Sequence, residues 1–537
     1  DELDVASLSS PEKVLEVVRS RQLTASIAVE CICRLGQLRA QFGQVRKQDM
    51  DGEEMESLVS LLTELVNRPD VQTAQLRDIM FSAANLGNTR KGDPVDRLIR
   101  RCSQVLLASA SEASMKDLSC GAWALAKRTI RDKLVLRALA SEGVLKIGES
   151  EVIDLSRFAW SFATVSVRSP ELFGVISVEA VQKRADFEPK GLANLLWAFA
   201  KLAVRDVALF SSLGKEAGKK LAAYRPVDLA NLAWSFATVS IKDDDLLRSL
   251  SARSTSSLSE FVAQDLSNLA WSYATLAVKD SELFRCLSAE AIWKLPSFTP
   301  QNISNIAWAF AKVNAADVSL MQAISDEASS NIGNFQAQGL SNLVWAFATV
   351  GHAEGEFIDV VTSASIRKID NFSPQHLSIL AWALAKLQVH NSEALECISV
   401  QALQKLDRFT PQNITNLAWA FATLDTENQV LFAALAQRSR VVLSRYKPGE
   451  MVNFAYSCAR VRFDDASLFG EIAKLSMSRL ADFTPQDVSN LAWAFASANV
   501  SDVHLLNALA TEAVQRLEVD AGQFLPREIA ALAWAVA

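Results

Sequence analysis

The residues best suited to bind a ligand form a row in which every member is a cation or a hydroxyl. Lys and Arg pair with phosphate oxygens, while Thr and Ser hydroxyls both donate and accept hydrogen bonds. The members recur every 37 residues at Lys127, Thr164, Lys201, Thr238, Thr275, Lys312, Thr349, Lys386, Thr423, Arg460 and Ser497. No Asp, Glu or Gln interrupts the row, although an ordinary solvated face would admit them. The row is therefore either a ligand-contact surface along the array or a solvated polar face.

A second row, seven residues before the first, carries amides. It consists of Asn194, Asn231, Asn268, Asn305, Asn342, Asn416, Asn453 and Asn490. These amides have two interpretations. They form a structural ladder that satisfies backbone groups between repeats, or they contact the same ligand as the cation and hydroxyl row.

Residues for catalysis or metal binding do not gather into a recognisable constellation. The four histidines, which include His352 and His376, lack metal-ligand spacing. The chain has neither a P-loop nor a dinucleotide-type Gly-rich stretch. We therefore expect no catalytic residue, no metal, no cofactor and no small-molecule substrate, and we expect the protein not to be an enzyme.

Both rows accompany an aromatic residue that lies in nearly the same octapeptide in each copy. It recurs every 37 residues at Trp123, Trp160, Trp197, Trp234, Trp271, Trp308, Trp345, Trp382, Trp419, Tyr456 and Trp493, and once more, 41 residues on, at Trp534. A fixed period of this length is typical of a stacked repeat array. Packing between repeats is the favoured role for these rings, and stacking on a ligand is the alternative.

Local signals predict two helices in each repeat. In the copy around Trp308, Thr299 suits an N-cap and Pro300 suits the first helical position. A second helix should follow, with an N-cap nine residues after the aromatic, as at Asp317. Projection of the first helix at 100° per residue puts Phe310 toward the second helix and Asn305, Trp308 and Lys312 together on the opposite face.

We therefore predict an all-α fold, an α-solenoid of tandem 37-residue two-helix repeats that forms a curved superhelix. Residues 1–110 hold weaker, degenerate N-terminal repeats or a cap, with Phe81 in the aromatic place. Residues 111–537 hold about eleven to twelve repeats, the last one truncated. Since the chain starts with Asp1 and stops three residues after Trp534, we expect it to be a piece of a longer product.

Composition narrows the class of protein. Half of the residues are hydrophobic and 21% are charged, as in a folded protein. No apolar run is long enough to cross a membrane, and seven scattered cysteines without a CxxC pair indicate a reducing compartment. The net charge of -7 does not indicate a nucleic-acid binder.

The repeat resembles known families. The segment from Thr299 to Ala311, Thr-Pro-Gln-Asn-Ile-Ser-Asn-Ile-Ala-Trp-Ala-Phe-Ala, resembles the heptatricopeptide and octotricopeptide repeats, including those of proteins with a RAP domain. It is also similar to the helical domain of kinetoplastid RNA-editing substrate-binding complex subunits. The resemblance covers roughly residues 115–537, and no RAP domain is present.

This resemblance implies a protein that binds single-stranded RNA in the mitochondrial matrix or the plastid, with about one nucleotide read by each repeat. RNA processing, stability, editing or translation would be its role, and the two polar rows would be its RNA-binding residues. The alternative is an armadillo-like scaffold that binds proteins of an organellar ribonucleoprotein or ribosome assembly. Neither interpretation requires a membrane.

Overall fold

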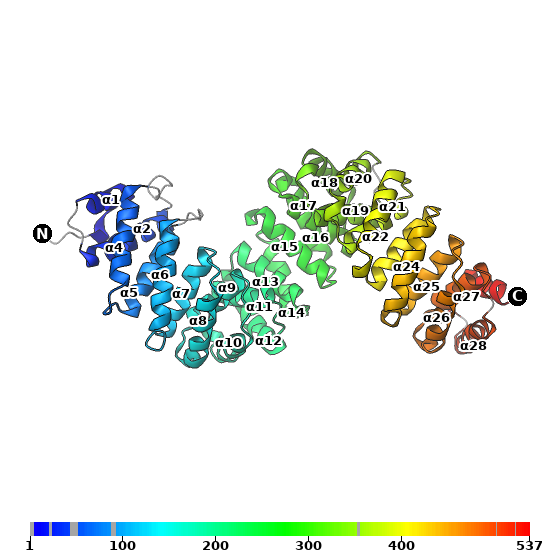
Figure 1. Cartoon of the computed structure of the whole chain (residues 1–537), viewed down its shortest axis with the longest axis horizontal. Coiled ribbons are helices and arrows are strands. Elements are labelled where there is room, and N and C mark those ends of the chain that lie inside the picture. The colour runs from blue at the N-terminus through cyan, green and yellow to red at the C-terminus, as the bar shows by residue number, and fades with distance from the viewer. Residues whose placement is uncertain are drawn as a thin grey trace. The chain divides into compact units, whose positions relative to one another are not determined.

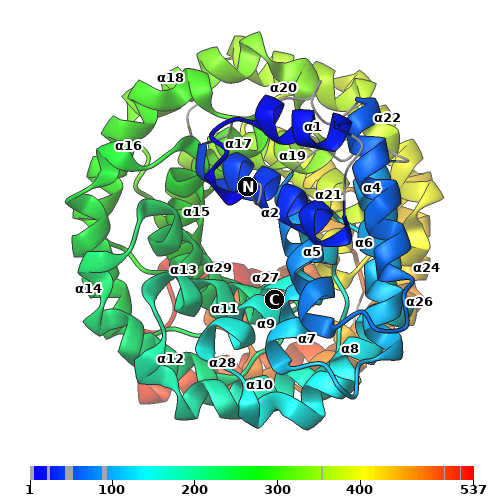
Figure 2. The ribbon, with the colours of Figure 1, turned by 90° about the vertical axis from the view of Figure 1, so that its left-hand side faces the viewer.

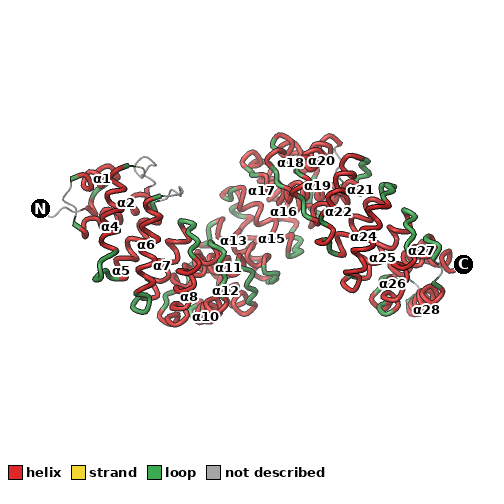
Figure 3. Tube along the Cα trace, viewed as in Figure 1, coloured by secondary structure: helices red, strands yellow, loops and turns green. Residues whose placement is uncertain are grey.

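The computed structural model describes residues 5–20, 24–42, 52–86, 93–351, 355–500, 502–520 and 522–537. These residues form helices joined by short connections, and no strand occurs among them (Figure 3). They divide into two compact units, Asp1–Leu283 and Phe284–Ala537 (Figure 1). The prediction of an all-α solenoid built from tandem two-helix repeats is confirmed.

The first helix of each repeat carries the aromatic residue of the motif. These helices are α5 (Thr73–Asn85), α7 (Met115–Lys127), α9 (Val152–Thr164), α11 (Pro189–Lys201), α13 (Pro226–Thr238), α15 (Ala263–Thr275), α17 (Pro300–Val313), α19 (Ala337–Val350), α21 (Pro374–Lys386), α23 (Pro411–Thr423), α25 (Pro448–Arg460), α27 (Pro485–Ser497) and α29 (Pro526–Val536). Most have 13 or 14 residues, close to the predicted length.

The second helices alternate with the first. They are α6 (Pro94–Ala108), α8 (Lys133–Lys146), α10 (Pro170–Gln182), α12 (Val207–Lys219), α14 (Asp244–Thr255), α16 (Ser281–Lys294), α18 (Val318–Ser330), α20 (Gly355–Arg367), α22 (Ser392–Gln404), α24 (Gln429–Val442), α26 (Ala466–Met477) and α28 (Val503–Val519). Before α5 lie α1 (Pro11–Arg19), α2 (Ala25–Phe42) and α4 (Glu53–Val66).

Side chains at the helix starts explain where the helices begin. The Thr299 hydroxyl accepts a hydrogen bond from the Asn302 amide at 3.3 Å, and the Asn302 side chain accepts one from the Thr299 amide at 3.1 Å. This reciprocal capping box satisfies two N–H groups that the helix leaves free. Asp317 caps α18 through the Leu320 amide at 2.7 Å, so both predicted N-caps are confirmed.

The end of the first helix contains a turn that the sequence pattern did not reveal. Six residues after the aromatic, the backbone enters the left-handed region, with φ of 55° at Ala203. The next amide, of Val204, then donates to the Phe199 carbonyl at 2.9 Å and closes the helix end. Glycine is the residue most often found in this left-handed conformation. Among the described repeats only Gly351 is a glycine at this position, so the sequence did not indicate the turn.

Each first helix packs along the first helix of the next repeat. In the first unit α7, α9, α11, α13 and α15 pack in succession, and in the second unit α17 to α29 do the same. Figure 2 shows α9, α11 and α13 on the inner side of the first unit, with α10, α12 and α14 outside them. Fully buried small residues such as Ala307 and Ala309 on either side of the motif aromatic let these helices approach closely.

Lysine clamps join the end of a second helix to the turn that precedes the first helix of its repeat. The Lys220 ammonium donates to the carbonyls of Ala185 and Phe187, both at 2.8 Å, and Lys405 contacts Asp370 and Phe372 in the same way at 2.8 and 2.9 Å. The carbonyls belong to the turn that leads into the first helix of the same repeat, α11 for Lys220 and α21 for Lys405. These lysine side chains therefore stabilise the packing of the helices, and their ammonium groups already have hydrogen-bond partners within the protein.

Candidate nucleic-acid interface

The cation and hydroxyl row lies in the last turn of successive first helices, on their inner side. The side chains of Lys127, Lys201, Lys312 and Lys386 are exposed, whereas the face that carries Phe310 is buried. The predicted separation of the two helix faces is therefore confirmed. Arg460 differs from these lysines, because its guanidinium pairs with the Asp425 carboxylate at 3.2 Å.

The threonines of this row fall into two groups. Thr275 and Thr349 are exposed, and Thr423 is half-buried. The hydroxyl oxygens of Thr164 and Thr238 are buried and lack a hydrogen-bond partner. An unpaired buried hydroxyl lowers the stability of the folded protein. A ligand that forms a hydrogen bond with these two hydroxyls would remove that cost.

The asparagine row runs beside the aromatic row and is half-exposed at most of its positions, Asn305 and Asn342 among them. Its amides do not build the buried ladder between repeats. That ladder uses other residues: the Ser119 hydroxyl donates to Asp154 at 2.7 Å, and the Asn413 amide donates to the Ser378 hydroxyl at 3.3 Å. Asn268 of the row accepts a hydrogen bond from the Gln264 side chain of its own helix at 2.8 Å, and ligand contact by the row stays a prediction.

The aromatic row both packs and faces outward. From Trp123 to Trp493 its rings are half-buried. Trp308 and Trp345 lie with ring centroids 6.2 Å apart, and Tyr456 and Trp493 lie 4.7 Å apart. The rings therefore contact one another across repeats and still leave part of their surface open, so packing and ligand stacking are compatible.

A third periodic row was missed in the sequence. Eight residues after the aromatic, in the loop between the two helices, the first unit carries a cation in five consecutive repeats. All five side chains are exposed: Arg131, Arg168, Arg205, Lys242 and Lys279. Arg131 and Arg205 also donate to the Ser166 and Val239 carbonyls at 3.1 and 3.2 Å, and Lys242 pairs with Asp244 at 3.1 Å. We call these five cations the basic edge. The acidic residue that follows each of four of them is an N-cap, as Asp206 is for α12, and the partial positive charge of the helix end offsets its charge.

The signal for the basic edge was present at the same 37-residue period as the other rows. Each of its residues stands directly before the N-cap position of the second helix, as Arg205 does before Asp206. In the second unit the corresponding described positions hold Ala316, His390, Glu427 and Asp464, and positions 353 and 501 lie outside the described residues. The basic edge therefore distinguishes the first unit from the second.

Metal-ligating and nucleophilic side chains are scattered over the described ranges. These ranges contain no group of three or more His, Cys, Asp or Glu residues placed to hold a metal, and His352 lies outside them. Burial raises the pKa of the Cys31 thiol to about 11 and that of Cys102 to about 12, which makes both thiols poor nucleophiles. Within the same ranges no helix is long and apolar enough to cross a membrane.

These features define the class of the molecule: a helical-repeat solenoid with a polar and aromatic inner face and one basic edge. A family model described as RNA-editing substrate-binding complex 6 protein matches residues 64–392, 342–502 and 391–537. These matches span most of the sequence, so the chain belongs to the RNA-editing substrate-binding complex 6 protein family. The resemblance to heptatricopeptide, octotricopeptide and RAP-associated repeats stays a prediction.

Other comparisons add little. No curated protein matches the sequence. The chain aligns over 98% of its length with 92% of a chain in a homology model of the AP-3 complex in an intermediate open conformation, at 9% identity and a TM-score of 0.29. It aligns over 96% of its length with 75% of importin-13 in its cytosolic state, at 11% identity and a TM-score of 0.27. Likenesses this distant carry no argument.

Proposed function

We propose that this chain is a non-enzymatic RNA-binding subunit of an RNA-editing substrate-binding complex in the mitochondrion. Single-stranded RNA runs along the inner face of the first unit. The basic edge holds its phosphates, and the asparagine and aromatic rows meet its bases. The observation that carries the proposal is an exposed loop cation in five consecutive repeats, each beside an aromatic ring on the adjoining helix face. Three of these repeats also present an amide there, at Asn194, Asn231 and Asn268.

The distribution of charge supports this proposal despite the acidic total. Of the 54 Lys and Arg residues, 36 lie in the first unit, which has 37 acidic residues and a net charge of -1. The second unit has 18 basic and 24 acidic residues, a net charge of -6. The negative net charge that argued against RNA binding thus lies mostly in the second unit.

The charge of the second unit favours the scaffold function for that part of the chain. A surface with a negative balance and no basic edge repels a phosphate backbone, and it suits the basic segments of partner proteins in a ribonucleoprotein. The RNA-binding and scaffold functions can therefore occur in one molecule, one in each unit. A plastid location, RNA processing outside editing and a role in ribosome assembly are alternatives that the same geometry permits.

The test is the salt dependence of binding of a random 20-nucleotide RNA to the full chain. Seven exposed cations, the basic edge together with Lys127 and Lys201, predict a slope of log K against log salt of about -5, at about 0.7 per neutralised phosphate on single strands. The slope falls to about -3 if Arg131, Arg205 and Lys242 keep their protein partners. A slope near zero, or equal binding of an unrelated acidic protein, would overturn RNA binding and leave the scaffold function.

A further inference from the structure

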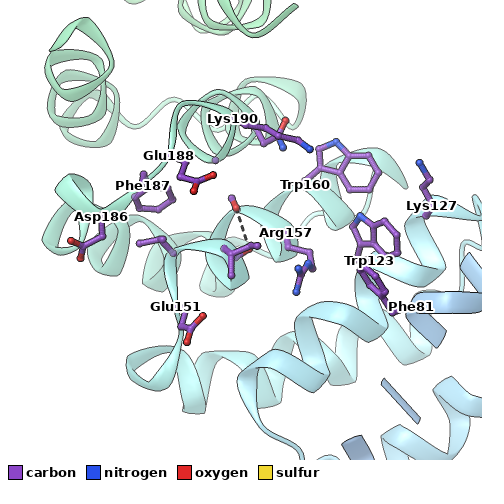
Figure 4. A pocket seen from close by; sticks show the side chains of 15 residues that line it. Phe81, Trp123, Lys127, Glu151, Arg157, Trp160, Asp186, Phe187, Glu188 and Lys190 are labelled. Carbon is purple, nitrogen blue, oxygen red and sulfur yellow. Dashed lines mark hydrogen bonds between the residues drawn. The ribbon is translucent and has the colours of Figure 1, made fainter. Parts of the chain in front are cut away.

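A cavity of about 730 Å³ opens on the inner face of the first unit. Its walls come from four consecutive first helices, α5, α7, α9 and α11, and from the turns that precede α9 and α11 (Figure 4). Pockets of about 300–1,000 Å³ hold ligands of the size of one or two nucleotides. The cavity therefore has room for a unit of the polymer that the proposed function places on this face.

The cavity forms partly because a glycine stands at a helix position where most other repeats have a larger side chain. At the third position of α9, the Asp154 carboxylate fills the space between helices and accepts the Ser119 hydroxyl at 2.7 Å. The same position of α11 is Gly191, so Ser156 has no such partner, and its hydroxyl bonds to the Ile153 carbonyl of its own helix at 3.1 Å. The ladder is therefore interrupted between α9 and α11, where the cavity lies.

One wall of the cavity is aromatic. Phe81 and Trp123 stack with centroids 4.8 Å apart and planes 27° apart, and the Arg157 guanidinium carbon lies 6.0 Å from the Phe81 centroid. Trp160 lies on the same side (Figure 4). Phe81 is 38% exposed although it belongs to an interface between repeats. Nucleobases stack on open aromatic surfaces of this kind whatever their sequence.

The charges of the cavity are separated. Lys127, Arg157 and Lys190 lie around the aromatic wall, whereas the carboxylates of Asp186 and Glu188 lie at the opposite end with Glu151 (Figure 4). A phosphate is attracted to the first end and repelled from the second. Carboxylates accept hydrogen bonds, so the second end suits ribose hydroxyls or the N–H groups of a base.

Arg157 makes this site differ from the other repeats. It stands three residues before Trp160, at the position that eight other repeats give to Asn. Its guanidinium donates to the Cys120 sulfur at 3.0 Å and lies 3.6 Å from Asp154. These contacts hold the planar group beside the aromatic wall, where guanidinium also binds phosphate oxygens in a bidentate manner.

We propose that this cavity binds one unpaired ribonucleotide of the RNA strand. Its base stacks on the Trp123 and Trp160 side, and its phosphate is held by Lys127, Arg157 and Lys190. The cavity thus anchors the strand and sets its register along the repeats. This inference rests on the proposed function, and it adds a particular site at which one nucleotide is held more tightly than its neighbours.

Two matched glycine substitutions test the anchor. A Cβ at Gly191 would meet Phe187 at 3.3 Å and Ser156 at 3.8 Å, and a Cβ at Gly339 would meet Phe335 at 3.2 Å and Ser304 at 3.5 Å. The two sites are structurally equivalent, but only Gly191 lines the cavity. Asn occurs naturally at this helix position, as Asn302 and Asn413 do, so Gly191→Asn and Gly339→Asn should both fold.

We expect Gly191→Asn to weaken binding of a 12-nucleotide RNA about tenfold, the effect of losing roughly one stacked base. Gly339→Asn should stay within about twofold of the unsubstituted chain. Arg157→Asn, which restores the common residue of its row, should also weaken binding about tenfold. Melting curves of all three variants show whether the fold is intact. Ultraviolet cross-linking of RNA that carries 4-thiouridine should place the strongest adducts on peptides containing Trp123 or Trp160.

Equal RNA affinity of the Gly191→Asn and Gly339→Asn variants, with adducts spread evenly along the repeats, would overturn the anchor. RNA binding along the face would then remain. Failure of the unsubstituted chain to bind RNA at low salt would overturn the anchor and the proposed function together. The two failures are therefore distinguishable in one set of measurements.

Discussion

The two units share a framework and differ in what they display. Both stack first helices closely through buried alanines, and both cap second helices with Asp or Asn. Both also clamp the end of a second helix to the turn before its first helix through a lysine such as Lys220 or Lys405. The first unit adds the basic edge and the cavity beside Arg157, whereas the second has acidic or neutral residues at the described edge positions. The difference shows that a repeat array can vary function through a few exposed positions without changing its packing.

The start of the first unit also has a buried arginine, at a position where the described repeats of the second unit have apolar residues. The Arg128 guanidinium, 1% exposed, pairs with Asp93 at 2.5 Å and Asp96 at 2.7 Å. The corresponding residues of the second unit are aliphatic, as at Leu424 and Val461. This ion pair joins the regular repeats to α6, in the part of the chain where the motif is weakest.

The largest effect is expected from Arg128→Leu. The substitution leaves Asp93 buried without its cation and should destabilise the junction of α6 and α7 by about 3–5 kcal/mol. Hydrogen exchange should show faster opening of α6 while the second unit keeps its protection. The double variant Arg128→Leu with Asp93→Asn should recover part of the loss. Unchanged exchange in α6 would show that the ion pair does not hold this junction.

The next effect separates the surfaces of the two units. The triple variant Arg168→Gln, Arg205→Gln and Lys279→Gln should lower RNA affinity about 100-fold at 0.1 M salt, since three lost contacts reduce the salt slope by about 2. Its control is the triple variant Lys312→Gln, Lys386→Gln and Arg460→Gln in the second unit. Filter binding should show a loss below about tenfold for this control.

A reversal of these two results would place the RNA on the second unit. The comparison can be sharpened by a gain of charge, because Ala316→Arg, Glu427→Arg and Asp464→Arg rebuild part of a basic edge there. If the strand can continue along the second unit, this triple variant should bind longer RNAs more tightly than the unsubstituted chain does.

A smaller effect tests the shared framework. Lys220→Met in the first unit and Lys405→Met in the second each remove a charged donor from two carbonyls. Both variants should lose about 1–2 kcal/mol of local stability, the usual cost of unpaired polar groups. Lys220 also pairs with the Glu216 carboxylate at 3.1 Å, so chemical denaturation should give a loss for Lys220→Met that equals or exceeds the loss for Lys405→Met. A larger loss for Lys405→Met would show that the units differ in packing as well as in surface.

The smallest effect concerns the turn after the first helix. Ala203 and Gln388 adopt φ of 55° and 56°, a conformation that costs an L-residue about 1 kcal/mol relative to glycine. Ala203→Gly and Gln388→Gly should each stabilise the protein by up to about 1 kcal/mol, less the entropy that glycine adds to the unfolded chain. Thermal unfolding should show a small rise in Tm for both variants.

The sequence predicted the repeat and its helices well because their signals are local. A cap such as Thr299 acts on an amide three residues away, and the separation of helix faces follows from 3.6 residues per turn. The period alone then requires stacking, because one two-helix unit cannot bury its apolar face. The polar rows were visible for the same reason, although their role in binding RNA stays a proposal.

The sequence alone thus determined the period, the helices, the N-caps and the face on which Asn305 and Lys312 lie. Only the tertiary structure decided which polar groups distant in the chain meet: the pairing of Ser119 with Asp154, the Lys220 clamp, the burial of Arg128 and the cavity beside Gly191. These contacts join residues more than 30 positions apart. Their distances depend on how closely helices stack, which side-chain packing sets and a local pattern does not record.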